Sequence, residues 1–379
     1  MLAYQIVALI LTMAYLGYFL YYLYGWITLP EFRSESSVHT TRVSIVIAAR
    51  NEAGNISLVL TDLLRQSYPS QLFEVIVVDD HSDDNTVQEV NPYLSERVSL
   101  VSLKENIDES ERIVSFKKRA IEAGISKSDG ELIVTTDADC RMGSAWLETL
   151  VSFYESTKAA MIVSPVMINE SENLLEKFQA LDLTGMMGIA GATLHLGFPT
   201  MCNGANLAFR RIVFDEVKGY EGINNKSSGD DMLLMHKIVR QHKGKVQFLK
   251  TRKAVVETNP LHSLRSLLIQ RMRWTSKSGA YDDRKIQINL LLVYLFNLSI
   301  VLSFIACFWV PGLRMLFFFQ LVTKLVLDFV FLSEVTYYFA RRKLMWLFLP
   351  MEVLHIIYII VVGFAGNFFT TNWKGRKVV

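Results

Sequence analysis

The amino-acid sequence predicts an α/β fold: a doubly wound, mostly parallel sheet with one N-terminal and about three C-terminal transmembrane helices. Short apolar runs alternate with helical patterns in the first half of the chain, which is typical of parallel strands covered by helices. Several runs end in acidic residues, and open α/β sheets bind ligands outside the carboxyl ends of their strands. Residues 2–29 and 286–313 contain no Lys, Arg, Asp or Glu, and each run can cross a bilayer, which takes roughly 20 apolar residues.

The composition narrows the class of protein. A chain of 379 residues can bury a large core, and its net charge of +2 gives no basic field for nucleic acid. The apolar fraction is 51% and is unevenly distributed. Three cysteines, Cys140, Cys202 and Cys307, make no disulfide framework, which suits a domain in the cytosol.

The N-terminal apolar run is interpreted as an anchor, because it is too long for a cleaved signal and lacks a basic n-region. Its end carries an aromatic belt typical of a membrane interface (Tyr18, Tyr21, Tyr22, Tyr24 and Trp26). Further apolar runs lie near 288–310, 315–338 and 344–368. The last either crosses the bilayer, which its length favours, or enters and returns.

The strands and helices of the soluble part follow in order. We predict strands at Val43–Ala49, Phe73–Val78, Val98–Leu103, Leu132–Val134 and Leu207–Phe209. Helices are predicted from residue 56 to a stop at Tyr68 and Pro69, between the second and third strands, and at 116–124, 232–242 and 263–278. The amphipathic stretch from Leu174 to Leu196 is either an interfacial membrane helix or an ordinary core helix.

The fourth strand ends in Asp137 and Asp139, within the sequence TTDADC. Two carboxylates at a strand end can hold a hard divalent cation, which in turn binds the phosphates of a nucleotide. The alternative is a pair of solvated acids in a turn. Neither GxGxxG nor GxxxxGK[ST] occurs, so carboxylates and a metal are expected to do what glycine-rich loops do elsewhere.

Two motifs near the end of the soluble part complete the chemistry. Asp230 and Asp231 open a helix, whose N-terminal end favours carboxylates. In the last helix, Gln270, Arg273 and Trp274 share a face; an arginine offers a planar fork of hydrogen-bond donors, and a tryptophan offers an apolar platform. The neighbouring arginine, at position 271, is expected to point elsewhere, toward lipid headgroups or a surface carboxylate.

Together these motifs resemble those of a family 2 glycosyltransferase with the GT-A fold, of the membrane-anchored kind that includes cellulose-synthase-like and ceramide-glucosyltransferase-like enzymes. The matching pieces are AARNE (48–52), QSYP (66–69), EVIVVDDHSDDNT (74–86), the Lys-rich helix (117–119), TTDADC (135–140), NGANLAFRR (203–211), GDD (229–231) and QRMRW (270–274). The tail NWKGR (372–376) is also common among such proteins.

The resemblance implies transfer of a sugar from a nucleoside diphosphate, usually a UDP-sugar, to an acceptor hydroxyl with inversion, using Mg²⁺ or Mn²⁺. It implies that Glu52, Asp79 and Asp80 hold the base and ribose, and that Lys117 or Lys118 reaches the nucleotide. Asp139 and Asp137 bind the metal, and Asp137 also places ribose and sugar. Asp231 is the base, beside Asp230, and Gln270, Arg273 and Trp274 receive pyrophosphate and acceptor. Two positions depart from the family pattern: His81 replaces the usual Gly, and Asp230 the usual Glu.

The predicted organisation is an anchor (1–30), a cytoplasmic glycosyltransferase domain (40–285), a transmembrane region (286–370) and a basic tail (371–379) in an inner or plasma membrane. The expected acceptor is a lipid. A processive polysaccharide synthase subunit is an alternative, although so few spans would hardly enclose a polymer channel. A non-catalytic membrane scaffold that binds sugar nucleotides is the alternative from another class.

Three features keep two interpretations each. Asn203 and Asn206 either touch the acceptor or only shape a turn. Lys324 and Asp328, four apart in an apolar run, are either functional or an ion pair that lets a helix insert, and the same holds for Glu352 and His355.

Overall fold

The computed structural model describes residues 1–34, 38–104, 115–169, 172–224, 229–276 and 284–366, and the backbone of 371–373 and 376–378. The chain forms two compact units. The sheet unit comprises Leu29–Asn169, Leu194–Pro260 and Asn372–Val379. The helical unit comprises Met1–Thr28, Glu170–Thr193 and Leu261–Thr371.

The sheet unit is built on a seven-stranded mixed sheet. Its strands, in spatial order, are β3 (Val98–Ser102), β2 (Phe73–Asp79), β1 (Val43–Ala49), β4 (Leu132–Thr135), β8 (Leu207–Arg210), β6 (Met161–Val163) and β9 (Val246–Phe248). The first four are parallel, β8 is antiparallel to both its neighbours, and β6 and β9 are parallel to each other. The predicted α/β class and all five predicted strands are confirmed.

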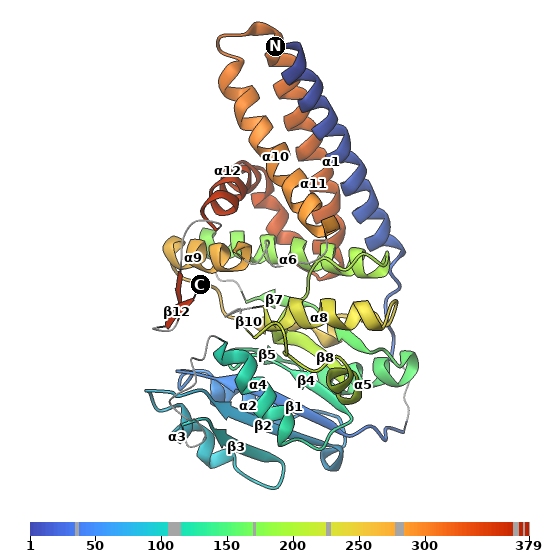
Figure 1. Ribbon diagram of the computed structural model, residues 1–379, viewed down its shortest axis with the longest axis vertical. Helices are drawn as coiled ribbons and strands as arrows, with labels where there is room; N and C mark the ends of the chain where they lie inside the picture. The colour runs from blue at the N-terminus through green and yellow to red at the C-terminus, as the bar shows by residue number, and fades with distance from the viewer. Residues whose placement is uncertain are drawn as a thin grey trace. The chain divides into compact units, whose positions relative to one another are not determined.

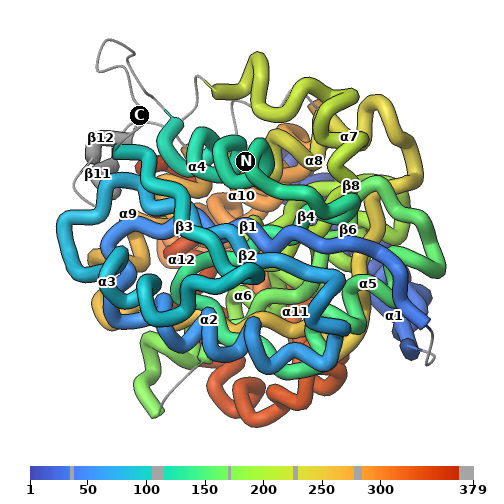
Figure 2. Tube along the Cα trace, turned by 90° about the horizontal axis from the view of Figure 1, so that it is seen from below, coloured from blue at the N-terminus to red at the C-terminus, as the bar shows by residue number. Residues whose placement is uncertain are grey.

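Helices cover both faces of this sheet, which explains why its central strands are largely apolar. They are α2 (Ile56–Leu64), α3 (Thr86–Val90), α4 (Phe116–Ser126), α5 (Trp146–Thr157), α7 (Arg211–Glu216) and α8 (Asp230–Gln241). In Figure 2, α4 lies on one side of the row of strands and α2 on the other. The fit of α4 is close, because a Cβ atom added to Gly124 would lie 2.4 Å from Cγ1 of Val46.

A second, three-stranded sheet joins β5 (Arg141–Met142), β10 (Val256–Thr258) and β7 (Val166–Ile168). The strand β10 is antiparallel to β5 and parallel to β7. The sequence predicted neither these strands nor β6 and β9, because two or three residues are too few to show a periodic pattern. Near the C-terminus, β11 (Thr371–Trp373) pairs with β12 (Arg376–Val378).

The helical unit consists of α1 (Leu2–Thr28), α6 (Leu174–His195), α9 (Leu264–Thr275), α10 (Arg284–Ala306), α11 (Arg314–Tyr338) and α12 (Phe348–Ala365). Among the described residues, four segments are long and apolar enough to cross a membrane, and they contain α1, α10, α11 and α12. Figure 1 shows α1, α10 and α11 lying lengthwise side by side, whereas α12 is seen nearly end-on. The predicted number of apolar spans is therefore confirmed.

Aromatic and small residues hold the helical unit together. The ring of Tyr15 on α1 stacks on Phe296 of α10 with centroids 4.1 Å apart. The helix α6 packs closely on α11, since a Cβ atom on Gly188 would lie 2.5 Å from Cγ2 of Val335. Of the two interpretations of the stretch beginning at Leu174, this contact favours a helix packed in a core.

Candidate active site

The turns that follow β1 and β2 bring together the three residues expected at the base and ribose. Because Ala49 of β1 pairs with Asp79 of β2, both strands end at the same edge. The side chain of Asp79 is 1% exposed, and both of its carboxylate oxygens face the backbone N–H of Ser82, at 3.3 and 3.4 Å. Asp80 is buried beside Nδ1 of His81 at 3.1 Å. Glu52 accepts a hydrogen bond from Nδ2 of Asn55 at 2.9 Å.

The turn after Asp80 keeps the backbone conformation that glycine favours, although His81 occupies the position. Its φ is 56°, in the left-handed region, which costs a non-glycine residue roughly 1–2 kcal/mol. The guanidinium of Arg50 stabilises this turn, because Nη1 donates to the carbonyls of Asp80 (2.9 Å) and His81 (2.8 Å). The substitution of His for Gly therefore leaves the turn in place and adds an imidazole to its surface.

An ammonium group connects the carboxylates of two distant motifs. Nζ of Lys117, on α4, lies 2.7 Å from Oδ1 of Asp137, which follows β4, and 3.5 Å from Oδ2 of Asp230, on α8. Burial alone would lower the pKa of Lys117, but the Asp137 and Asp230 carboxylates outweigh it and raise the pKa above its ordinary value. Lys117 is thus a fixed positive charge between the carboxylates of these two motifs.

The carboxylate of Asp231 is held by two backbone N–H groups. Oδ2 accepts from the N–H of Gly204 at 3.1 Å, and Oδ1 accepts from the N–H of Met232 at 2.7 Å. A Cβ atom on Gly204 would lie only 3.2 Å from Oδ2 of Asp230, so a glycine allows this close approach. The hydroxyl of Thr135 donates to the carbonyl of Gly204 at 3.0 Å, which links β4 to the same turn.

Gly204 and Thr135 were not singled out from the sequence. They support the site through a backbone N–H and a hydroxyl, and neither group stands out in a sequence. The only signal is a glycine between two asparagines in NGAN, at a turn where the backbone must approach another element closely.

The residues at the end of β4 suit a metal that is shared with a diphosphate. Within the part of the chain that the structure describes, no group of three or more His, Cys, Asp or Glu could hold a metal ion. Mg²⁺ is commonly bound through one or two carboxylates while phosphates and water complete its shell. Both carboxylates are partly exposed; Asp137 is paired with Lys117, and Oδ2 of Asp139 lies 3.4 Å from Oγ1 of Thr258. The donor set therefore fits a metal held chiefly by Asp139 together with a bound nucleotide.

Asn206 has a structural role. Its side chain is fully buried, Oδ1 accepts from Nε1 of Trp146 at 3.0 Å, and Nδ2 donates to the carbonyls of Pro165 and Ala254, both at 2.8 Å. Asn203 begins the adjoining turn, where its Oδ1 accepts from the N–H of Ala205 at 3.0 Å. Of the two interpretations of these asparagines, the contacts support the shaping of a turn.

The residues Gln270, Arg273 and Trp274 lie on α9 in the helical unit, and all three are partly exposed. The expectation for Arg271 was wrong. Its side chain is 4% exposed and pairs with Oδ2 of Asp182, on α6, at 2.8 Å, instead of meeting lipid headgroups or a surface carboxylate. The helices α6 and α9 pack together within the helical unit, and the sequence of α9 does not show that partner.

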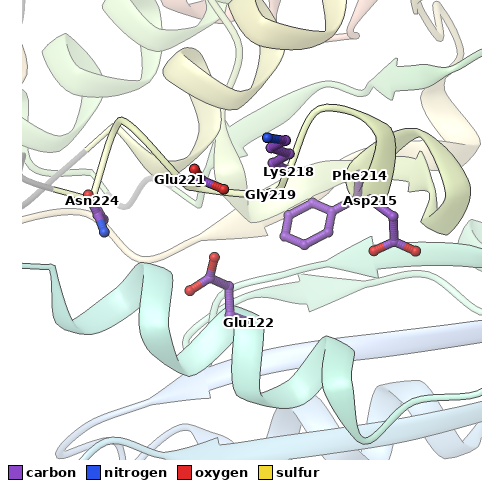
Figure 3. A pocket seen from close by; sticks show the side chains of 7 residues that line it. All are labelled: Glu122, Phe214, Asp215, Lys218, Gly219, Glu221 and Asn224. Atoms are coloured by element: carbon purple, nitrogen blue, oxygen red, sulfur yellow. The ribbon is translucent and has the colours of Figure 1, made fainter.

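A separate hollow of about 450 Å³ lies beside α4, lined by Glu122, Phe214, Asp215, Lys218, Gly219, Glu221 and Asn224. Figure 3 shows Glu122 pointing from α4 toward the segment that carries the other six. The carboxyl of Glu122 accepts from the N–H of Tyr220 at 3.2 Å. Three carboxylates and one ammonium line this hollow, and none of the residues predicted for the site is among them.

Known families and proteins match this arrangement. The model described as "Glycosyl transferase family 2" matches residues 44–217, and the one described as "Glycosyl transferase family group 2" matches residues 132–365. The chain is 27% identical over 208 residues to the probable glycosyltransferase YdaM of Bacillus subtilis, covering 54% of this chain and 49% of that protein. It is 26% identical over 197 residues to the beta-monoglucosyldiacylglycerol synthase of Trichormus variabilis, covering 52% of this chain and 41% of that protein. The chain thus spans less than half of the length of these two relatives.

The fold is also that of a solved structure, the mannosyltransferase PcManGT of Pyrobaculum calidifontis in complex with GDP-Man and Mn²⁺. The two chains superpose with a TM-score of 0.62 at 17% identity, over 95% of this chain and 99% of the other. The second family model covers more than half of the chain. With its mixed sheet and the carboxylates gathered around Lys117, the chain therefore belongs to glycosyl transferase family group 2 and is a glycosyltransferase with the GT-A fold.

Proposed function

We propose that this glycosyltransferase moves a sugar from a nucleoside diphosphate to a hydroxyl group of a lipid acceptor, with a divalent metal and with inversion at the anomeric carbon. The observation that carries the proposal is the position of Lys117 between Asp137 and Asp230. Transfer from a diphosphate needs positive charge near the leaving group, and Lys117 supplies one beside the carboxylates that follow β4 and begin α8.

In this proposal the donor is held by the turns at the ends of the strands. Glu52, Asp79 and Asp80 bind the base and ribose, while Asp137 places the ribose and sugar. Asp139 holds Mg²⁺ or Mn²⁺, which when bound neutralises charge on the leaving diphosphate. The solved mannosyltransferase with GDP-Man and Mn²⁺ supports a divalent metal with this fold, and a uridine nucleotide is the first donor to test.

The base in this proposal is Asp231. Its carboxylate accepts the proton of the acceptor hydroxyl as the oxygen forms a bond to the anomeric carbon and the bond from that carbon to the diphosphate oxygen breaks. The two backbone N–H groups that Asp231 accepts from, those of Gly204 and Met232, orient the carboxylate before the acceptor arrives. Asp230 acts indirectly, by sharing the Lys117 ammonium with Asp137.

A lipid acceptor is supported by the four apolar helices and by the relative that is a beta-monoglucosyldiacylglycerol synthase. We assign Gln270, Arg273 and Trp274 to the pyrophosphate and the acceptor, with Trp274 as the apolar platform. The glycosyltransferase domain, residues 40–285, then faces the cytoplasm from an inner or plasma membrane, because Arg33, Arg42 and the basic α9 follow the first anchor.

The test is to incubate the purified protein in detergent with a panel of nucleotide sugars and Mg²⁺ or Mn²⁺, with and without a lipid extract. We expect nucleotide release from one class of donor, increased by lipid, and a product that carries a single added sugar by mass spectrometry. If none of the donors in the panel releases its nucleotide, the proposed transfer is refuted. Release that lipid leaves unchanged would refute the lipid acceptor, and a ladder of products would indicate a polysaccharide synthase.

A further inference from the structure

A line of buried charged side chains runs through the helical unit. On α11, Nζ of Lys324 lies 2.7 Å from Oδ2 of Asp328 and 2.8 Å from Oε1 of Glu352, on α12. The hydroxyl of Tyr15, on α1, donates to Oδ1 of Asp328 at 2.6 Å. Charges buried this deeply, with Lys324 1% exposed, persist only where they are paired.

The line continues from α12 to α6 and α9. The imidazole of His355 lies between two carboxylates, with Nδ1 3.6 Å from Oε1 of Glu352 and Nε2 3.6 Å from Oδ1 of Asp182. The other oxygen of Asp182 lies 2.8 Å from Nη2 of Arg271. Burial alone would raise the pKa of Asp182, but Arg271 and His355 outweigh it and hold the pKa below its ordinary value. Asp182 is therefore a buried, ionised carboxylate that lies between two basic side chains.

The final contact joins this line to the residue assigned to the acceptor. The guanidinium carbon of Arg271 lies 4.2 Å from the centroid of the Trp274 ring. A cation over a tryptophan face is attractive, more so where water is excluded. Because Asp182 fixes the guanidinium and the guanidinium covers one face of the ring, only the opposite face of Trp274 can receive a ligand.

We propose that Asp182 is a positioning residue for acceptor binding, which acts through Arg271 to set the orientation of the Trp274 ring. This inference rests on the proposed role of Trp274 as the acceptor platform. Without its carboxylate partner, the buried guanidinium must find other acceptors, and the ring loses the cation that fixes it. The acceptor step then suffers while the donor step does not.

The variant that tests this is Asp182→Asn, which keeps the shape of the side chain and removes its charge. We expect the acceptor KM to rise about tenfold while metal-dependent hydrolysis of the donor stays within about twofold. In a Trp274→Ala background the same substitution should have no further effect on the acceptor KM. The charge-preserving variant Asp182→Glu should raise the acceptor KM less than Asp182→Asn does. Glu176→Gln, on the same helix but paired with His262 at 3.0 Å, is the matched control and should leave both steps unchanged.

A second measurement is independent of transfer. The part of the acrylamide quenching of tryptophan fluorescence that disappears in Trp274→Phe measures the accessibility of Trp274. This part should be larger in the Asp182→Asn protein than in the wild type. Equal losses in transfer and hydrolysis, full additivity with Trp274→Ala, or unchanged quenching would each overturn the inference. If Asp182→Asn does not fold, Arg271→Lys takes its place, because it keeps the charge but loses the planar fork. Increased quenching in a protein that transfers nothing to lipid would refute only the proposed function.

Discussion

Replacing Asp231 by Asn separates the proposed chemistry from the structural role of the same side chain. Each carboxylate oxygen accepts one backbone hydrogen bond, from Gly204 and from Met232. An asparagine has only one acceptor oxygen, so Asp231→Asn must lose one of these bonds and turn its NH₂ group toward a backbone N–H. The expected cost is about 1–3 kcal/mol of unfolding free energy, or a Tm lower by roughly 2–4 °C for each kcal/mol. Loss of the base should lower turnover by roughly 10²–10⁴-fold.

The assay combines three measurements on the purified protein: nucleotide release, nucleotide affinity by calorimetry, and Tm in detergent. Affinity should change little, because the substitution leaves Lys117 and Asp139 in place. The matched control is Glu155→Gln. Oε1 of Glu155 also accepts from two backbone N–H groups, those of Thr40 (3.3 Å) and Thr41 (3.4 Å), but near the amino-terminal end of β1. A glutamine can keep these two bonds but loses the carboxylate contact with Nδ1 of His39, at 2.8 Å, so this variant should lose stability and keep its turnover.

One pattern of results would refute this assignment. If Asp231→Asn abolishes nucleotide affinity yet retains substantial turnover, Asp231 binds the donor and the base is another group, with Asp230 the nearest candidate. If Glu155→Gln loses as much turnover as Asp231→Asn, the effect is due to stability and the assignment of a base has no support.

Three further outcomes are expected. Asp139→Ala should abolish metal-dependent nucleotide binding measured by calorimetry, and full wild-type turnover in EDTA would contradict this. The carboxylates raise the pKa of Lys117, so the contribution of Lys117 to stability is complete below its ordinary pKa of about 10.4 and is lost only above the raised pKa. The Tm difference between wild type and Lys117→Met should therefore stay constant from about pH 7 to 9.5. A Tm difference that shrinks in this range would refute the ion pair. Asn206→Ala should cost roughly 3–5 kcal/mol, because it leaves Nε1 of Trp146 and two backbone carbonyls unpaired in the core; a wild-type Tm would contradict that role.

The sequence was sufficient for the parallel half of the sheet. The strand Val43–Ala49 has the predicted bounds, and Phe73–Asp79 and Leu132–Thr135 exceed the predicted strands by one residue each. These strands are covered on both faces, so their residues are almost all apolar and the polar residues after them mark where each strand ends. The strands β6 and β9 have three residues each, and at that length pairing with neighbours, which the sequence does not display, decides the structure.

The candidate site was predicted as separate motifs, and their connection was not. Asp137 and Asp230 are recognisable as acids after a strand and before a helix, but their common partner Lys117 depends on where α4 packs. Asn206 looked equally suited to a ligand or a turn, and only its burial decides between them. The surroundings of Arg271 were predicted wrongly because its carboxylate partner, Asp182, lies on a helix that is distant in the sequence.

The bond between Tyr15 and Asp328 has a consequence for how the protein is made. The two residues are 313 positions apart in the chain, and at roughly 5–20 residues per second a ribosome needs on the order of 15–60 s to add that stretch. During this interval Tyr15 has no Asp328 to bond with, and α1, which has no charged residues, must remain without this contact. Lys324 and Asp328 lie on one helix, so they can already pair with each other when that helix forms. Most of the sheet unit is synthesised before the helical unit can pack together. A substitution that weakens the packing of α1 should therefore impair assembly only at the end of synthesis.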